Sequence, residues 1–156
     1  MCESKTLDDV YELSVTHYID APPDKVWRVL TERLQDWWCP KPWRTVVNAI
    51  DWRAGGVFDT KMIGPEGQEF DNAGVFLEVT PGKRFVFTDA FDGQWNPKPA
   101  FMIGLFEIAP EGVGTRYTAS ARHWKQEEME KHKEMGFTDG WMAVACQVAE
   151  LAEAAD

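Results

Sequence analysis

The sequence contains no hydrophobic run that approaches the roughly 18 apolar residues of a membrane span. The segment from Met1 to Val10 has no basic stretch followed by an apolar one, which is the pattern of a secretory signal. These two absences lead us to expect a soluble, cytoplasmic protein without a membrane partner.

Cysteine is scarce as well. The chain has three cysteines, Cys2, Cys39 and Cys146, and their odd number and wide spacing fit neither a secreted disulfide framework nor a paired metal-ligand motif. We therefore expect reduced thiols. Cys146 follows Trp141 on an expected helix, and we predict that its thiol is buried and inert.

The sequence also lacks the motifs of metal and cofactor chemistry. Its only histidines, His17, His123 and His132, do not stand in a His-x-x-x-His spacing with an acidic partner. It has no Gly-x-Ser-x-Gly motif, no phosphate-binding glycine-rich loop and no dinucleotide fingerprint. We therefore predict neither a metal site nor a bound cofactor.

Basic residues are too few to balance the acidic ones. Lysine and arginine total 16 against 26 aspartates and glutamates, which gives a net charge of -10. A surface of this sign repels the phosphate backbone of DNA or RNA. We therefore expect no nucleic-acid partner.

The composition itself is that of one globular domain. The chain has 156 residues, of which 44% are hydrophobic and 27% charged, a size and balance that suit a single core. Residues 1–11 are polar and predict a flexible N-terminal arm, so the single domain covers residues 12–156. Eight tryptophans and nine phenylalanines exceed what a core of this size needs, so some rings should serve another purpose.

The first third of the domain predicts a strand, two helices and a loop. Alternating apolar residues indicate a strand over 12–20, and Pro22 and Pro23 then end it and begin a helix. Apolar residues at helical spacing predict two short helices between 23 and 37. The segment 37–43 contains two prolines and three tryptophans and cannot be a regular helix, so it predicts an aromatic loop.

The middle of the chain alternates between β-rich runs and turn residues. Gly and Pro pairs separate the runs, which is typical of strands joined by short connections. Such consecutive strands form an antiparallel meander rather than strand-helix-strand units. The six expected strands cover residues 44–51, 57–63, 69–79, 84–91, 100–109 and 114–123.

The end of the chain predicts helix. A charged run over 125–134 is typical of an exposed helix, and after Gly136 the apolar residues recur at helical spacing on one stripe. Gly136 and Gly140 would each cost about 1 kcal/mol inside an exposed helix, so we expect either a close approach of another backbone or a kink there, and with a kink the helix would be bipartite. The fold class is α+β: a curved seven-stranded antiparallel sheet around a long C-terminal helix.

Five stretches, in this order, match the pattern of a known family: Ile19–Trp27, Ala54–Phe58, Leu77–Thr88, Gly114–Tyr117 and Met135–Trp141. Together they resemble the START-like superfamily with its helix-grip fold. More narrowly, they resemble the branch related to the C-terminal domain of the activator of Hsp90 ATPase, often labelled polyketide-cyclase-like. The resemblance covers residues 13 to about 152.

This resemblance implies a deep cavity between sheet and helix, which members use for apolar or amphipathic ligands. It implies no universal catalytic residue. Members range from ligand binders to cyclases and protein-binding modules, so the fold alone does not assign a function.

Strand alternation selects the polar candidates. Asp89 shares one face of its strand with Phe85 and Phe87, and His123 shares one face of the last strand with Tyr117. If those faces are concave, Asp89 and His123 enter the cavity, where they could act as general base and acid or anchor the polar end of a ligand. The alternative is a structural pair, or two groups at the rim.

The aromatic candidates for a ligand site complete this set. We expect the loops 37–43 and 92–99 to act as movable gates, with Trp43 and Trp95 in contact with a ligand or a partner. Phe58, Phe76 and Phe87 also fit an ordinary core. The expected ligand-binding residues are Trp37, Trp43, Phe58, Phe76, Phe87, Trp95, Phe101, His123 and Trp141.

Three functions are compatible with these features. The first is the binding of a small hydrophobic or aromatic molecule between the sheet and the helix of Trp141. The second is a protein-interaction module related to the Hsp90 activator, with a partner that offers a basic patch and binds more weakly as salt rises. The third is a cyclase, dehydratase or hydrolase that uses Asp89 and His123. Both a monomer and a homodimer fit the sequence.

Overall fold

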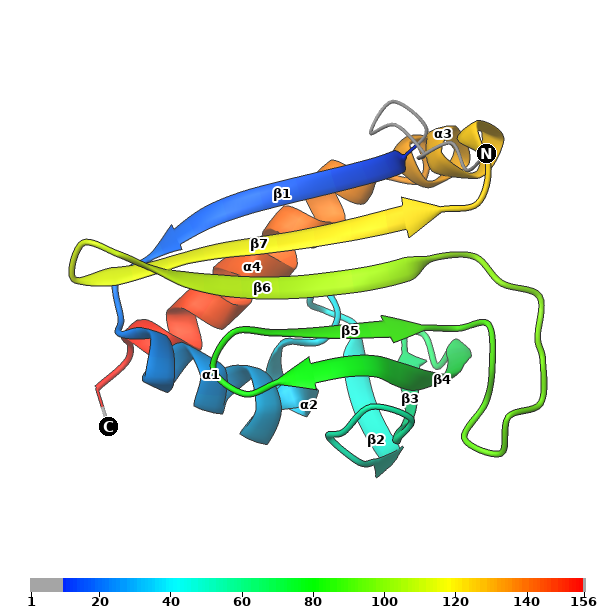
Figure 1. The fold of residues 1–156 in the computed structure, drawn as a ribbon, viewed down its shortest axis with the longest axis horizontal. Helices are drawn as coiled ribbons and strands as arrows, with labels where there is room; N and C mark the ends of the chain where they lie inside the picture. Colours follow the sequence, from blue (N-terminus) through cyan, green and yellow to red (C-terminus); the bar gives the residue numbers. More distant parts are fainter. Residues whose placement is uncertain (1–9, 156) are drawn as a thin grey trace, which may run out of the picture.

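The computed structural model describes residues 10–155, so most of the expected N-terminal arm and Cys2 lie outside the described residues. Seven strands and four helices follow one another along the chain (Figure 1). They are β1 (Tyr11–Ile19), α1 (Pro23–Glu32), α2 (Leu34–Trp37), β2 (Arg44–Ile50), β3 (Val57–Ile63), β4 (Glu69–Thr80), β5 (Arg84–Thr88), β6 (Ile103–Glu111), β7 (Gly114–His123), α3 (Gln126–Glu134) and α4 (Phe137–Glu153).

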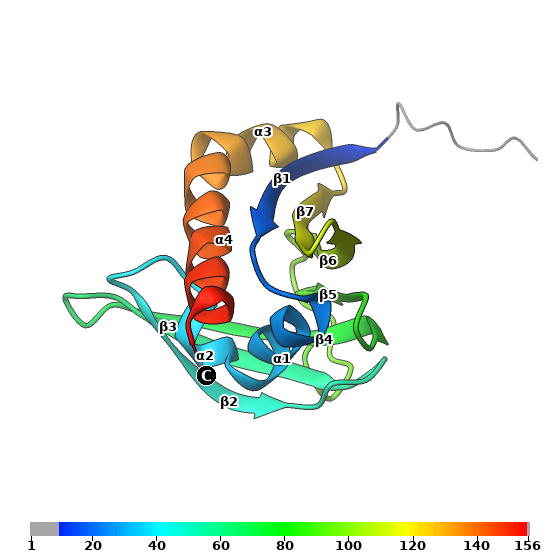
Figure 2. The ribbon, with the colours of Figure 1, turned by 90° about the vertical axis from the view of Figure 1, so that its left-hand side faces the viewer.

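All seven strands form one antiparallel sheet in the order β1-β7-β6-β5-β4-β3-β2. The order follows from a meander of β2 to β7, with β1 added beside β7 at the far edge. Figure 2 shows the sheet curling around α4, with α3 at one end of that helix and α1 and α2 near its other end. The predicted α+β helix-grip fold is confirmed.

The largest differences from the predicted strand boundaries lie at the end of β5 and the start of β6. β5 ends at Thr88 and β6 begins at Ile103, so the chain between them forms a long loop. The carboxylate of Asp89 accepts hydrogen bonds from the backbone N–H groups of Phe101 and Met102 at 2.9 and 3.3 Å. These side-chain hydrogen bonds take the place of backbone hydrogen bonds that would continue the pairing of β5 with β6, so both strands stop short of their predicted bounds.

The expected break in the C-terminal helix lies at Gly136, which has φ of 96° between α3 and α4. This left-handed backbone suits glycine, because a side chain would be strained there. Gly140 lies within α4, where an added Cβ would meet only Pro40 at 4.0 Å. The kink is therefore a property of Gly136 alone.

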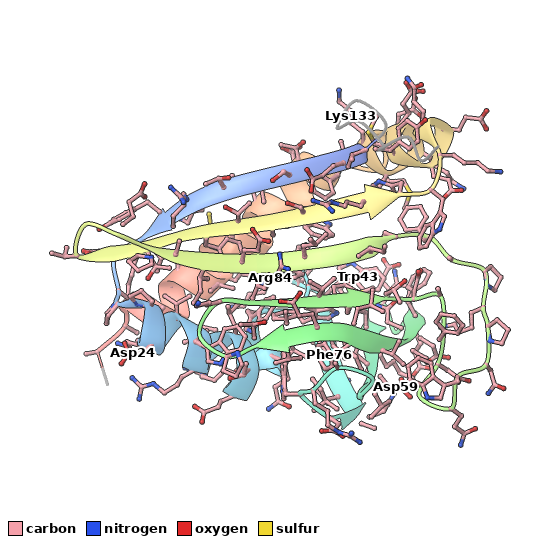
Figure 3. All side chains as sticks on the ribbon, viewed as in Figure 1. Asp24, Trp43, Asp59, Phe76, Arg84 and Lys133 are labelled. Carbon is pink, nitrogen blue, oxygen red and sulfur yellow. The ribbon has the colours of Figure 1, made fainter. Side chains whose placement is uncertain are left out.

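The inner face of the sheet is aromatic, and its outer face carries ion pairs. Phe58 stacks on Phe76 at 4.8 Å, and Phe85 stacks on Phe106 at 4.9 Å between ring centroids. On the outer face, Arg84 joins Glu78 of β4 to Glu107 of β6 (Figure 3). Within residues 10–155, no helix is long and apolar enough to cross a membrane.

Candidate functional site

A cavity of about 250 Å³ lies between the sheet and α4. We call it the main cavity. Its wall includes the rings of Trp38, Phe106, Tyr117 and Trp141. Trp38 comes from the end of α2, Phe106 and Tyr117 from the inner faces of β6 and β7, and Trp141 from α4. Three separate layers of the fold therefore meet at this cavity.

A second, smaller cavity of about 120 Å³ adjoins the first and is called the side cavity. The two share the lining residues Trp38, Asn72 and Met102. Phe58, Phe87 and Phe101 contribute further rings to the side cavity. Trp38 makes edge contacts with Phe58 and Phe87 at 5.0 and 5.4 Å, so its ring stands between the two cavities.

Both cavities contain a buried hydroxyl without a partner. The oxygens of Tyr117 in the main cavity and Thr60 in the side cavity make no hydrogen bond to any described residue. Tyr117 is 0% and Thr60 1% exposed, so bulk water does not satisfy them. Burial raises the pKa of the Tyr117 phenol, which keeps its proton in place.

Two histidines close one end of the main cavity. His132 of α3 lines it, and its Nδ1 lies 2.9 Å from Nε2 of His123 on β7. His123 Nδ1 in turn lies 3.2 Å from the carbonyl oxygen of Tyr11. Burial, and next the neighbouring His123, lower the pKa of His132 to about 4. His132 is therefore neutral at pH 7, and His123 reaches the main cavity only through it.

The structure does not bring Asp89 and His123 together. Thr88 pairs with Ile103, which pairs with Arg122, so β6 runs between the two candidates. Two strand spacings are roughly 10 Å. Asp89 lines the side cavity and is bonded to the backbone of the β6 loop, whereas His123 is bonded to His132 and Tyr11. An acid-base pair made of these two side chains is not formed.

Apart from the two loop tryptophans, the expected aromatic residues divide into three groups. Trp141 lines the main cavity, and Phe58, Phe87 and Phe101 line the side cavity. Trp37 and Phe76 are 0% exposed and belong to the core, where the indole N–H of Trp37 donates to the carbonyl of Val29 at 3.1 Å.

The two loop tryptophans expected as gates lie away from both cavities. Trp43 packs on Phe70 at 5.7 Å and lines a separate surface groove. Trp95 is 56% exposed and contacts Phe91. Neither ring is among the residues that line the main cavity or the side cavity.

Three important residues were not among the candidates. Trp38, Tyr117 and His132 all line the main cavity. Strand alternation placed Tyr117 on the same face as His123 and could have identified it. Nothing in the sequence distinguished Trp38 from Trp37, because the short helix α2 decides which of the two neighbouring rings enters the cavity.

The thiols behave differently from one another. Cys39 is buried, lies 3.1 Å from the hydroxyl of Thr45, and has a pKa that burial raises. Cys146, in contrast, is exposed, so the prediction of a buried thiol there was wrong. The core face of α4 runs through Ala145, Val148 and Ala149, and this turns Cys146 outward.

Residues 10–155 contain no cluster of potential metal ligands.

Comparisons with known proteins agree with this architecture. The family model described as "Activator of Hsp90 ATPase homolog 1-like protein" matches residues 20–153. A crystal structure from Nitrosomonas europaea is 41% identical, with a TM-score of 0.84 over 90% of this chain and 92% of that one. No curated protein matches the chain.

More distant structures share the fold alone. A protein from Mycobacterium smegmatis is 24% identical, with a TM-score of 0.78 over 97% of this chain and 95% of that one. An AHSA1 protein from Silicibacter pomeroyi is 20% identical, with a TM-score of 0.66 over 89% and 95%.

Proposed function

Since the chain belongs to the Activator of Hsp90 ATPase homolog 1-like family, and has a ring-lined cavity at the centre of its fold, we propose that it binds a small, largely apolar aromatic molecule there. The main cavity of about 250 Å³ carries this proposal. A concave space of this size that is lined mainly by rings and methionines is typical of a site for a small apolar ligand.

The wall of the main cavity is suited to a flat ring system. Trp141 is stacked on Phe106 at 5.6 Å with an interplanar angle of 19°, and both residues line the main cavity, so the parts of the rings that the stack leaves uncovered contribute to an apolar wall. Met62 and Met102 supply flexible, polarisable contacts beside the rings. Aromatic rings and methionine together accommodate planar apolar molecules through dispersion and edge or face contacts.

Binding can be tested by calorimetric titration with naphthalene, combined with native mass spectrometry of the protein purified from its own cells. We expect saturable binding by the wild type. Val144→Phe should abolish it, because Val144 lines the main cavity and a phenyl ring would fill the space. Cys146→Phe is the matched control, since this neighbour on α4 is exposed. Equal binding by both variants would refute the assignment to this cavity.

A protein-interaction module is the second candidate, and the loop between β5 and β6 favours it. Asp92 accepts hydrogen bonds from the backbone N–H groups of Gln94 and Asn96 at 2.9 and 3.0 Å. This arrangement holds Trp95 in a left-handed backbone conformation with φ of 65° and leaves its ring 56% exposed. A rigid exposed tryptophan is a typical contact residue in protein interfaces.

The second candidate has a separate test. Wild-type and Trp95→Ala proteins would be used as baits in lysate of the source cells, at low and high salt. We expect a stoichiometric partner that the variant loses and that binds more weakly as salt rises, since the net charge is -10. Retention of the same partner by Trp95→Ala would exclude this loop as the contact.

A further inference from the structure

We propose that the molecule held in the main cavity is uncharged and carries a hydroxyl group that hydrogen-bonds to the hydroxyl of Tyr117. This inference rests on the proposed function and adds the chemical class of the ligand. It assigns Tyr117 as the residue that recognises the polar group.

The position of the Tyr117 hydroxyl is the main argument. Tyr117 is in the middle of β7, paired with His17 and Ile108, and is 0% exposed. Its oxygen has no partner among residues 10–155, and Tyr117 is one of the residues that line the main cavity. A buried polar group left unpaired destabilises the folded protein. Phenylalanine would pack equally well without that cost, so the hydroxyl has a use other than packing.

The histidine pair supplies a second polar point in the same cavity. The carbonyl oxygen of Tyr11 can only accept, so His123 Nδ1 carries a hydrogen and donates to it. With one proton on each ring, His132 Nδ1 donates to His123 Nε2. His132 Nε2 is then a bare acceptor without a described partner, and a hydroxyl of the ligand can donate to it.

The charges around the cavities exclude an anion. The lining of both cavities includes no lysine or arginine. The only carboxylate there is Asp89, in the side cavity, where it is already bonded to two backbone N–H groups. A carboxylate or phosphate on the ligand would lose its hydration and gain no cationic partner. The main cavity has no acidic residue to bind a cation either.

The size of the cavity limits the ring system. An apolar cavity of about 150 Å³ in another protein accommodates benzene. The main cavity, at about 250 Å³, therefore has room for two fused rings. A naphthalene skeleton with one hydroxyl combines this size with the polar group that Tyr117 requires.

The test compares three probes of one shape at pH 7.5: naphthalene, 2-naphthol and 2-naphthoate. Calorimetry should give a dissociation constant about tenfold lower for 2-naphthol than for naphthalene, the value of about one hydrogen bond. The carboxylate should bind most weakly. Tyr117→Phe should remove most of the advantage of 2-naphthol over naphthalene.

Thr60→Val is the matched control, because it removes the other unpartnered hydroxyl from the side cavity and should leave the preference for 2-naphthol intact. Tyr117→Phe should melt at the wild-type temperature or above, which separates recognition from folding.

The outcomes distinguish the two proposals. If none of the three probes binds the wild type, the proposed function itself fails. If naphthalene binds but 2-naphthol has no advantage, or if Tyr117→Phe keeps that advantage, the hydroxyl class is wrong and an apolar site remains. Tightest binding of 2-naphthoate would likewise overturn the present inference.

Discussion

The buried pair His123 and His132 is the most unusual polar feature at the residue scale. Both are mostly buried, at 7% and 8% exposure, and the ring of His132 is in contact with Phe101, Phe137 and Trp141. Such surroundings tolerate a neutral imidazole and oppose a charged one. The pair joins α3 to β7 and so connects the end of the cavity to the sheet.

We predict a specific pH dependence of stability from His132. Its pKa falls from 6.5 to about 4 on folding, so between these values the unfolded chain binds a proton that the folded protein does not. Stability is therefore complete above pH 6.5 and falls as the pH is lowered towards 4, by about 3 kcal/mol in all. Urea unfolding at intervals from pH 4 to 8 would measure it.

His132→Gln supplies the control for this experiment, because glutamine does not titrate. Its unfolding free energy should vary much less than that of the wild type across the same window. The contribution of Glu78, whose pKa the Arg84 hydrogen bonds lower to about 2, declines as the pH falls through about 4.5, but it is the same in both proteins and cancels when they are compared. An equal pH dependence in both proteins would contradict the assignment to His132.

Gly104 gives a second prediction at this scale. A Cβ added there would lie 2.2 Å from the ring of Phe87, which crosses β6 at this point. Gly104→Ala should therefore destabilise the fold by about 1–3 kcal/mol through overpacking and displace a ring of the side cavity. Chemical denaturation would measure the loss, and a variant as stable as the wild type would show that Phe87 can move aside.

At the scale of the elements, two glycines four residues apart have opposite roles. Gly136 separates α3 from α4 with a left-handed backbone, while Gly140 is inside α4, where an added Cβ would make only an ordinary contact with Pro40. We predict that Gly136→Ala costs about 1–2 kcal/mol, the penalty of a side chain in that conformation. Gly140→Ala should instead stabilise the protein by about 0.5–1 kcal/mol through helix propensity. Thermal unfolding of both variants would check the pair.

Two results would contradict these predictions for Gly136 and Gly140. If Gly136→Ala were neutral, α3 and α4 would be able to join as one continuous helix, and His132 would no longer be held against His123. If Gly140→Ala were destabilising, the added methyl group would be in too close a contact with Pro40.

At the scale of the whole molecule, a ligand bound only by the folded state must raise its stability. At a free concentration of 100 times the dissociation constant, the gain is about 2.7 kcal/mol. We therefore expect 2-naphthol to raise the melting temperature of the wild type and to leave that of Val144→Phe unchanged. An identical rise in both proteins would place the binding outside the main cavity.

Much of the fold could be predicted from local patterns. Alternation in β1, the proline pair that begins α1 and the apolar stripe of α4 each depend on residues near in sequence, so their physical cause is visible there. The same applies to the break at Gly136. The end of β5 could not be predicted, because it depends on the Asp89 carboxylate reaching a backbone about a dozen residues further along the chain.

The candidate site was predictable only in outline. A surplus of rings, together with the resemblance, indicated a cavity opposite Trp141, and Trp141 does line it. Asp89 and His123 were placed on inner faces by alternation, but alternation does not report which strands are neighbours. The register puts β6 between them.

The sequence by itself thus determined the strand and helix pattern, the acidic charge and the aromatic inner surface, since each follows from the chemistry of nearby residues. Only the tertiary structure decided which groups meet. It selected Trp38 over Trp37 for the cavity wall, joined His132 to His123, and left the hydroxyl of Tyr117 without a partner. These outcomes depend on the curvature of the sheet and the kink at Gly136, which bring distant segments together in ways that local patterns do not record.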